Sequence, residues 1–144
     1  MASKSYNIAI IPSTAAAEAA IAASRFLEGS GSLFVLDGQK IFPHVSLYHV
    51  SLPEEALSDV VTALERILAG TEPFLMQQEV YRTTSEDGWI DVSYRKDEAI
   101  VRLHEAVIEA TKGFRDKERS VLEEWVHKMT PVRQANLDAC GWSE

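Results

Sequence analysis

The segment 42–52 constrains the fold of this chain more than any other, because it combines a β-strand pattern with a fixed start and a helix close behind it. Its sequence is Phe-Pro-His-Val-Ser-Leu-Tyr-His-Val-Ser-Leu. Side chains of a strand point alternately to its two faces. A strand that opens at Pro43 therefore places Val45 and Leu47 against a core. Three polar residues share the opposite face: His44, Ser46 and Tyr48.

An imidazole and a hydroxyl two residues apart on a rigid strand can contact one small anion together. His44 would move a proton, and Ser46 would donate a hydrogen bond. Because Tyr48 follows on the same face, we expect it to contact the same ligand.

The residues Pro-His-Val-Ser-Leu at 43–47 resemble the His-x-Thr/Ser motif of the two-histidine (2H) phosphoesterase superfamily. That group includes 2′-5′ RNA ligase-like proteins and cyclic phosphodiesterases. The resemblance extends in order of elements from about Tyr6 to the C-terminus. It implies that one histidine acts as general base and another as general acid, while Ser or Thr hydroxyls hold the phosphate. His44 would then be the acid or base, and Ser46 the phosphate donor.

The family carries two such motifs, and this sequence shows only the first. The repeated His-Val-Ser-Leu at 49–52 is not expected to be the second. His49 is an odd number of positions from His44, so a period of two places it on the other face. Ser51 is expected to be the N-cap of a capping box completed by Glu54. We therefore expect His49 to be structural.

By the resemblance, a second motif would follow the last helix, where only 142–144 remain after Gly141. Three explanations stay open: a fragment of a longer protein, a half-site completed by a partner, or a member that has lost activity. The end just after a helix favours truncation, so we expect one 2H-like domain over 1–144 that is incomplete at its C-terminus. Missing strands leave an open sheet edge, which predicts a homodimer.

Composition narrows the function. With 46% hydrophobic and 25% charged residues among 144, the chain matches a soluble globular domain. A net charge of −8 argues against a broad nucleic-acid surface, but it leaves room for a small phosphorylated ligand or an RNA end. The single Cys140 and the lack of a signal peptide predict a cytoplasmic location. The alanine-rich run 15–23 is too short to span a membrane.

The remaining patterns predict an α+β fold with antiparallel strands and helices packed on their outer faces. The turn Asp37-Gly38 predicts a hairpin leading into the strand of His44. Strands are expected at 5–11, 33–36, 73–82 and 88–95. Helices are expected at 14–27, 52–69, 97–112, 116–129 and 131–140, capped by Ser13 or Thr14, Ser51, Asp97 and Thr130.

Two further polar residues alternate with apolar ones on the strand 88–95. If their face lines the cleft of His44, Ser93 and Arg95 are substrate contacts; a solvated outer face is the more frequent alternative. His104 is expected to be a packed residue with one hydrogen bond, and His127 a surface residue. No cysteine or histidine cluster has metal spacing and no glycine-rich phosphate loop precedes a helix, so no metal or organic cofactor is expected.

We therefore expect a phosphodiesterase or RNA ligase-like protein that acts on cyclic or 2′-5′ phosphodiester linkages of nucleotides or RNA ends. The alternative is a non-catalytic module that binds a nucleotide or a protein through the same cleft. A third hypothesis is a structural domain in which His44 and Ser46 satisfy each other.

Overall fold

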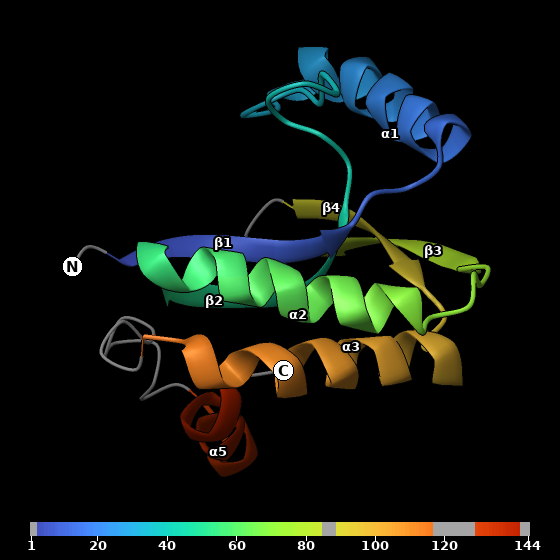
Figure 1. Ribbon diagram of the computed structural model, residues 1–144. Coiled ribbons are helices and arrows are strands. Elements are labelled where there is room, and N and C mark those ends of the chain that lie inside the picture. The colour runs from blue at the N-terminus through green and yellow to red at the C-terminus, as the bar shows by residue number, and fades with distance from the viewer. Residues whose placement is uncertain (1–2, 85–88, 117–128, 142–144) are drawn as a thin grey trace.

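Two antiparallel pairs of strands and four α-helices make up the part of the chain that the computed structural model describes, residues 3–84, 89–116 and 129–141 (Figure 1). In chain order the elements are β1 (Ser3–Ile10), α1 (Thr14–Leu27), β2 (Val45–Pro53), α2 (Leu57–Ala69), β3 (Gln78–Thr84), β4 (Trp89–Tyr94), α3 (Glu98–Thr111) and α5 (Pro131–Cys140). Short 3₁₀ turns cover Glu28–Ser30, Glu54–Ala56 and Lys112–Phe114. The expected α+β class is confirmed.

The strand pair β1–β2 contains a β-bulge. Ile8 pairs with Tyr48, but the next residue, Ala9, pairs with Ser46. Leu47 is therefore an extra residue in β2 without a partner position on β1. A bulge of this kind shifts the alternation of side chains along the strand that carries it.

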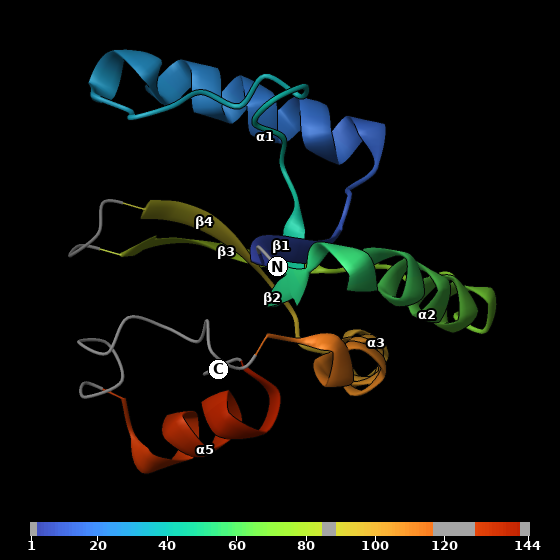
Figure 2. The ribbon, with the colours of Figure 1, turned by 60° about the vertical axis from the view of Figure 1, so that its left-hand side comes forward.

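The hydrophobic core lies between β2 and the helices α2 and α3, which run side by side against the β1–β2 pair (Figures 1 and 2). Burial of apolar surface of this kind is the main favourable contribution to folding. The buried members of this core are Leu47, Tyr48, Val50, Leu52, Val60, Leu103 and Val107.

Three predicted helix starts are confirmed by their caps. The Asp97 carboxylate accepts hydrogen bonds from Ala99 N and Ile100 N, both at 3.1 Å. The Ser13 hydroxyl accepts from Ala16 N at 3.5 Å. Thr130 caps α5 with Pro131 at its first turn, and Gly141 ends that helix with a left-handed φ of 78°. Such caps satisfy backbone groups that the helix itself leaves unpaired.

The predicted capping box at Ser51 is wrong. Ser51 stays in β2, and its buried hydroxyl has no hydrogen-bond partner among the described residues. The chain turns into α2 through the 3₁₀ turn Glu54–Ala56 instead. The Glu54 side chain pairs with Lys4 of β1, so it supports the β1–β2 pair and not a helix N-terminus.

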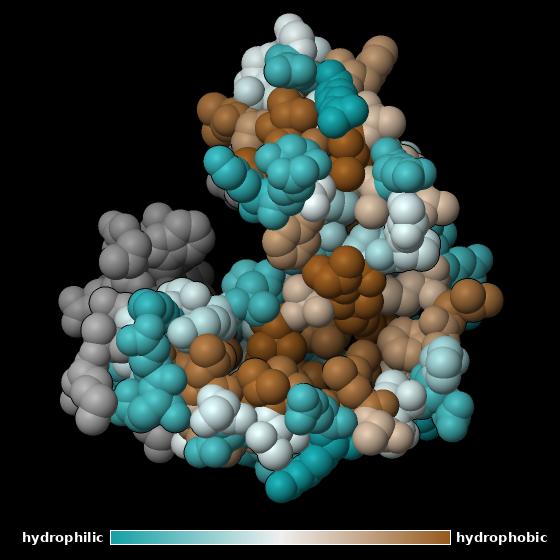
Figure 3. Space-filling view, turned by 45° about the horizontal axis from the view of Figure 1, so that its top comes forward, coloured by the Kyte–Doolittle hydropathy of each residue, from teal (hydrophilic) through white to brown (hydrophobic). Residues whose placement is uncertain are grey.

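Helix α1 departs from the expected packing of helices on the sheet. It contains no buried residue, and together with the loop 31–44 it projects away from β1–β2 (Figures 1 and 2). The expected hairpin is not formed, since the segment 33–36 is not a strand and β2 pairs with β1. The Asp37 carboxylate does hold a turn by accepting three backbone N–H groups. Apolar side chains are left at the surface of this projection (Figure 3): Phe26, Leu33, Phe34, Ile41 and Phe42.

The second strand pair is shorter than expected, since β3 begins at Gln78 and not at residue 73. The expected helix 116–129 falls almost wholly on 117–128, which lie outside the described residues, and so does His127. None of the helices in the described ranges is long and apolar enough to cross a membrane.

Candidate functional site

The bulge at Leu47 decides which side chains of β2 share a face. Leu47 and Tyr48, neighbours in sequence, are both buried, with 7% and 0% of their surface exposed. Ser46 and His49 are both exposed, and the Ser46 Oγ lies 3.2 Å from His49 Nε2. The expectation that His49 faces away from Ser46 is therefore wrong, because the extra residue between them reverses the phase of the strand.

Asn7 completes a cluster with these two residues. It lies opposite His49 in the register of β1 and β2, and its Nδ2 donates to the Ser46 Oγ at 2.9 Å. We call Asn7, Ser46 and His49 the Ser46 cluster. Asn7 was missed from the sequence, although it is the one polar residue in the apolar run 6–11.

His44 directly precedes β2 and is exposed. Its Nδ1 lies 3.0 Å from the carbonyl oxygen of Phe42, and its ring meets the Phe42 ring edge-on with centroids 5.8 Å apart. A carbonyl oxygen only accepts, so Nδ1 carries the proton and Nε2 carries the lone pair of the neutral imidazole. His44 is thus held in one tautomer at the start of the strand.

His44 influences the pKa of His49 electrostatically. Burial lowers the pKa of His49, and the nearby His44 lowers it further. Both causes disfavour the charged form of the ring. An anion bound beside His49 would favour the charged form and so raise the pKa of the ring.

Tyr48 does not share the exposed face with Ser46, and this part of the sequence interpretation is wrong. Its ring is fully buried, and its hydroxyl donates to the carbonyl oxygen of Cys140 at the end of α5. Burial raises the pKa of the Tyr48 hydroxyl. The bulge is again the reason, because it turns Tyr48 toward the core.

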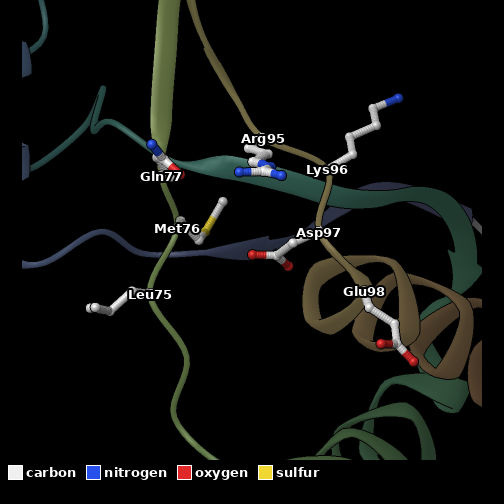
Figure 4. A pocket seen from close by; sticks show the side chains of 7 residues that line it. All are labelled: Leu75, Met76, Gln77, Arg95, Lys96, Asp97 and Glu98. Carbon is white, nitrogen blue, oxygen red and sulfur yellow. The ribbon is translucent and has the colours of Figure 1, made fainter.

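Ser93 and Arg95 are placed differently from each other. Ser93 is buried on β4, and its hydroxyl bonds with the backbone of Val80, as donor to the carbonyl at 3.1 Å and acceptor from N–H at 3.3 Å. Arg95 is exposed and lines an open depression of about 700 Å³ between the start of β3 and the N-terminus of α3 (Figure 4). The lining residues are Leu75, Met76, Gln77, Arg95, Lys96, Asp97 and Glu98. They include neither His44 nor any member of the Ser46 cluster.

The prediction for His104 is confirmed. This residue of α3 is half-buried, and its Nδ1 donates to the carbonyl oxygen of Leu47 at 2.7 Å. Within the described ranges, no group of three or more histidine, cysteine or acidic side chains is arranged to hold a metal ion.

A model of the 2′-5′ RNA ligase superfamily matches residues 12–139. The chain belongs to this superfamily. The expected membership of the 2H phosphoesterase superfamily is confirmed, and it supports phosphoesterase or ligase-like chemistry in general. Searches of curated proteins and of solved structures found no match.

Proposed function

We propose that the chain binds a cyclic or 2′-5′ phosphodiester of a nucleotide or RNA end, and opens or joins it at the surface of His44 and the Ser46 cluster. One observation carries the proposal. In a chain of the 2′-5′ RNA ligase superfamily, the Ser46 hydroxyl is held by Asn7 and His49 on an exposed strand surface that begins at His44.

His44 supplies the proton transfer in this proposal. Its neutral ring can accept a proton at Nε2, because Nδ1–H is bound to Phe42. In the hydrolysis of a 2′,3′-cyclic phosphate, water gives a proton to this base while the water oxygen attacks phosphorus. The bond between phosphorus and one ribose oxygen breaks, and that oxygen takes up the proton that His44 has gained.

Ser46 supplies the phosphate contact. Its hydroxyl can donate to a phosphoryl oxygen, and bonds to a charged acceptor are stronger than neutral ones. The net charge of −8 repels extended polyanions. We therefore propose a small phosphorylated ligand or an RNA end as the partner, and not a long nucleic acid.

The test is calorimetric titration of 2′,3′-cyclic AMP into the wild type and the His44→Ala and Ser46→Ala variants, with product formation followed by chromatography. His44→Ala should lower turnover by about 10²–10⁴. Ser46→Ala should mainly weaken binding. Ser58→Ala, an exposed serine of α2, is the matched control and should change neither.

Equal affinity and equal turnover in wild type and His44→Ala would remove this surface from consideration. Binding that needs His44 and Ser46 but yields no product would favour the other candidate, a non-catalytic nucleotide-binding module.

A further inference from the structure

The Ser46 hydroxyl has one proton to donate and two lone pairs that accept. Asn7 Nδ2, at 2.9 Å, can only donate to it. His49 Nε2, at 3.2 Å, donates or accepts according to its protonation. The direction of this second bond therefore decides where the proton of Ser46 points.

We propose that His49 is a positioning residue that turns the Ser46 hydroxyl toward a bound phosphate; this inference rests on the proposed function. With Nε2 unprotonated, His49 accepts the proton of Ser46, and the hydroxyl has none left for a ligand. With Nε2 protonated, His49 donates to the same oxygen as Asn7. Both lone pairs of Ser46 are then used, and its O–H is released to donate to a phosphoryl oxygen.

The surroundings of His49 make this switch responsive to an anion. In the unliganded chain, burial and then His44 lower the pKa of His49, which favours the neutral ring; in its Nδ1–H tautomer this ring withholds the hydroxyl. A phosphate beside Ser46 favours the protonated ring. The exposed β1 residue opposite His49 is the uncharged Asn7, and the exposed Ser5, which pairs with Ser51, is uncharged as well. Because the charge of His44 affects the pKa of His49, His44 must be controlled for; His104 bonds β2 from the α3 side.

A double-mutant cycle on His49 and Ser46 tests the proposal. Affinity for 2′,3′-cyclic AMP is measured by calorimetric titration into the full chain. The titrations are made at about pH 5.5 and about pH 8.5, which lie on either side of the usual histidine pKa. His49→Phe should weaken binding roughly tenfold at the lower pH, as for one charge-assisted hydrogen bond. At the higher pH the loss should stay below about threefold, because the wild-type ring is then neutral. In a Ser46→Ala background, His49→Phe should have no further effect.

His49→Gln is the matched rescue variant. Its amide N–H can donate to Ser46 at any pH, so it should recover affinity and depend less on pH than the wild type. If His49→Phe fails to fold, NMR titration of the His49 ring in the wild type replaces it. Binding of 2′,3′-cyclic AMP should then raise the pKa of His49, and an unchanged pKa would overturn the proposal.

Failure of this inference is distinguishable from failure of the proposed function. If the proposed function fails, wild type binds no cyclic nucleotide, or binds it regardless of His44→Ala. If only the role of His49 is wrong, binding still depends on His44, but one of two results differs from the expectation. Either His49→Phe binds as tightly as wild type, or His49→Phe weakens binding in the Ser46→Ala background as well.

Discussion

Replacing Tyr48 by phenylalanine tests whether this residue belongs to the core or to the site. The ring of Tyr48 is fully buried, and its hydroxyl donates to the Cys140 carbonyl. The Arg115 guanidinium donates to two earlier carbonyl oxygens of α5, that of Leu137 at 3.1 Å and that of Asp138. The last carbonyls of a helix have no partner within it. Tyr48 and Arg115 therefore fasten the end of α5 to the rest of the fold.

Tyr48→Phe keeps the ring and removes one hydrogen bond. A typical bond contributes about 0.5–1.5 kcal/mol, and a buried acceptor left unpaired costs about 1–3 kcal/mol. Cys140 is only half-buried, so water can replace part of the loss. We expect the free energy of unfolding to fall by about 1–2 kcal/mol, which lowers the melting temperature by roughly 2–8 °C for a chain of this size.

Urea unfolding followed by circular dichroism measures this change. Tyr81→Phe is the matched control, because the Tyr81 side chain is 65% exposed, and it should stay within about 0.5 kcal/mol of wild type. Affinity for a cyclic nucleotide should be unchanged in Tyr48→Phe. A variant that is as stable as wild type but binds nucleotide more weakly would refute the core assignment.

The stability difference between wild type and Tyr48→Phe should also depend on pH in one direction. Burial raises the pKa of Tyr48 above its usual value of 10.0. The folded state therefore holds this proton more tightly than the unfolded state does. The contribution of Tyr48 is fully present below about pH 10 and is lost as pH rises through the folded pKa. The advantage of wild type over the variant should shrink at alkaline pH.

The remaining predictions concern a cap, a loop and association. Asp97→Ala removes the N-cap of α3 and should cost about 0.5–2 kcal/mol in a thermal melt. Backbone N–H groups of 39–41, that of Ile41 foremost, lower the pKa of Asp37 below its usual 3.8, and titration followed by carbon NMR should find a midpoint below 3.8. The stabilising effect of the Asp37 carboxylate should be lost only as pH falls through this lowered pKa. The unpaired edges of the described strand pairs predict a dimer; light scattering that finds only monomer at high concentration would contradict this.

The parts of the fold that could be predicted from sequence are those set by residues close together in the chain. Ser13, Asp97 and Thr130 each bond a backbone N–H two or three positions ahead. Gly141 ends α5 because a left-handed conformation is easily adopted there. Such signals depend on local geometry alone. The failed capping box at Ser51 shows the limit, because pairing of β2 with β1 continued past the expected helix start.

The composition of the site could not be predicted from an unbroken period of two, but a signal for the bulge is present in the sequence. Between His44 and Leu47 the apolar residues occupy odd positions, and from Tyr48 to Leu52 they occupy even positions. The phase therefore changes between these two residues, where the structure has its bulge. A change of phase within one strand predicts that polar residues three apart, such as Ser46 and His49, meet on one face.

His104 connects this bulge to the core. Its Nδ1 donates to the carbonyl oxygen of Leu47, the extra residue of β2. A bulge leaves backbone groups outside the strand ladder, and a buried carbonyl without a partner is costly. His104 supplies that partner from α3. A packed histidine with one hydrogen bond thus helps to fix the register that brings Ser46 to His49, so the geometry of the exposed site depends on a contact on the opposite side of the strand.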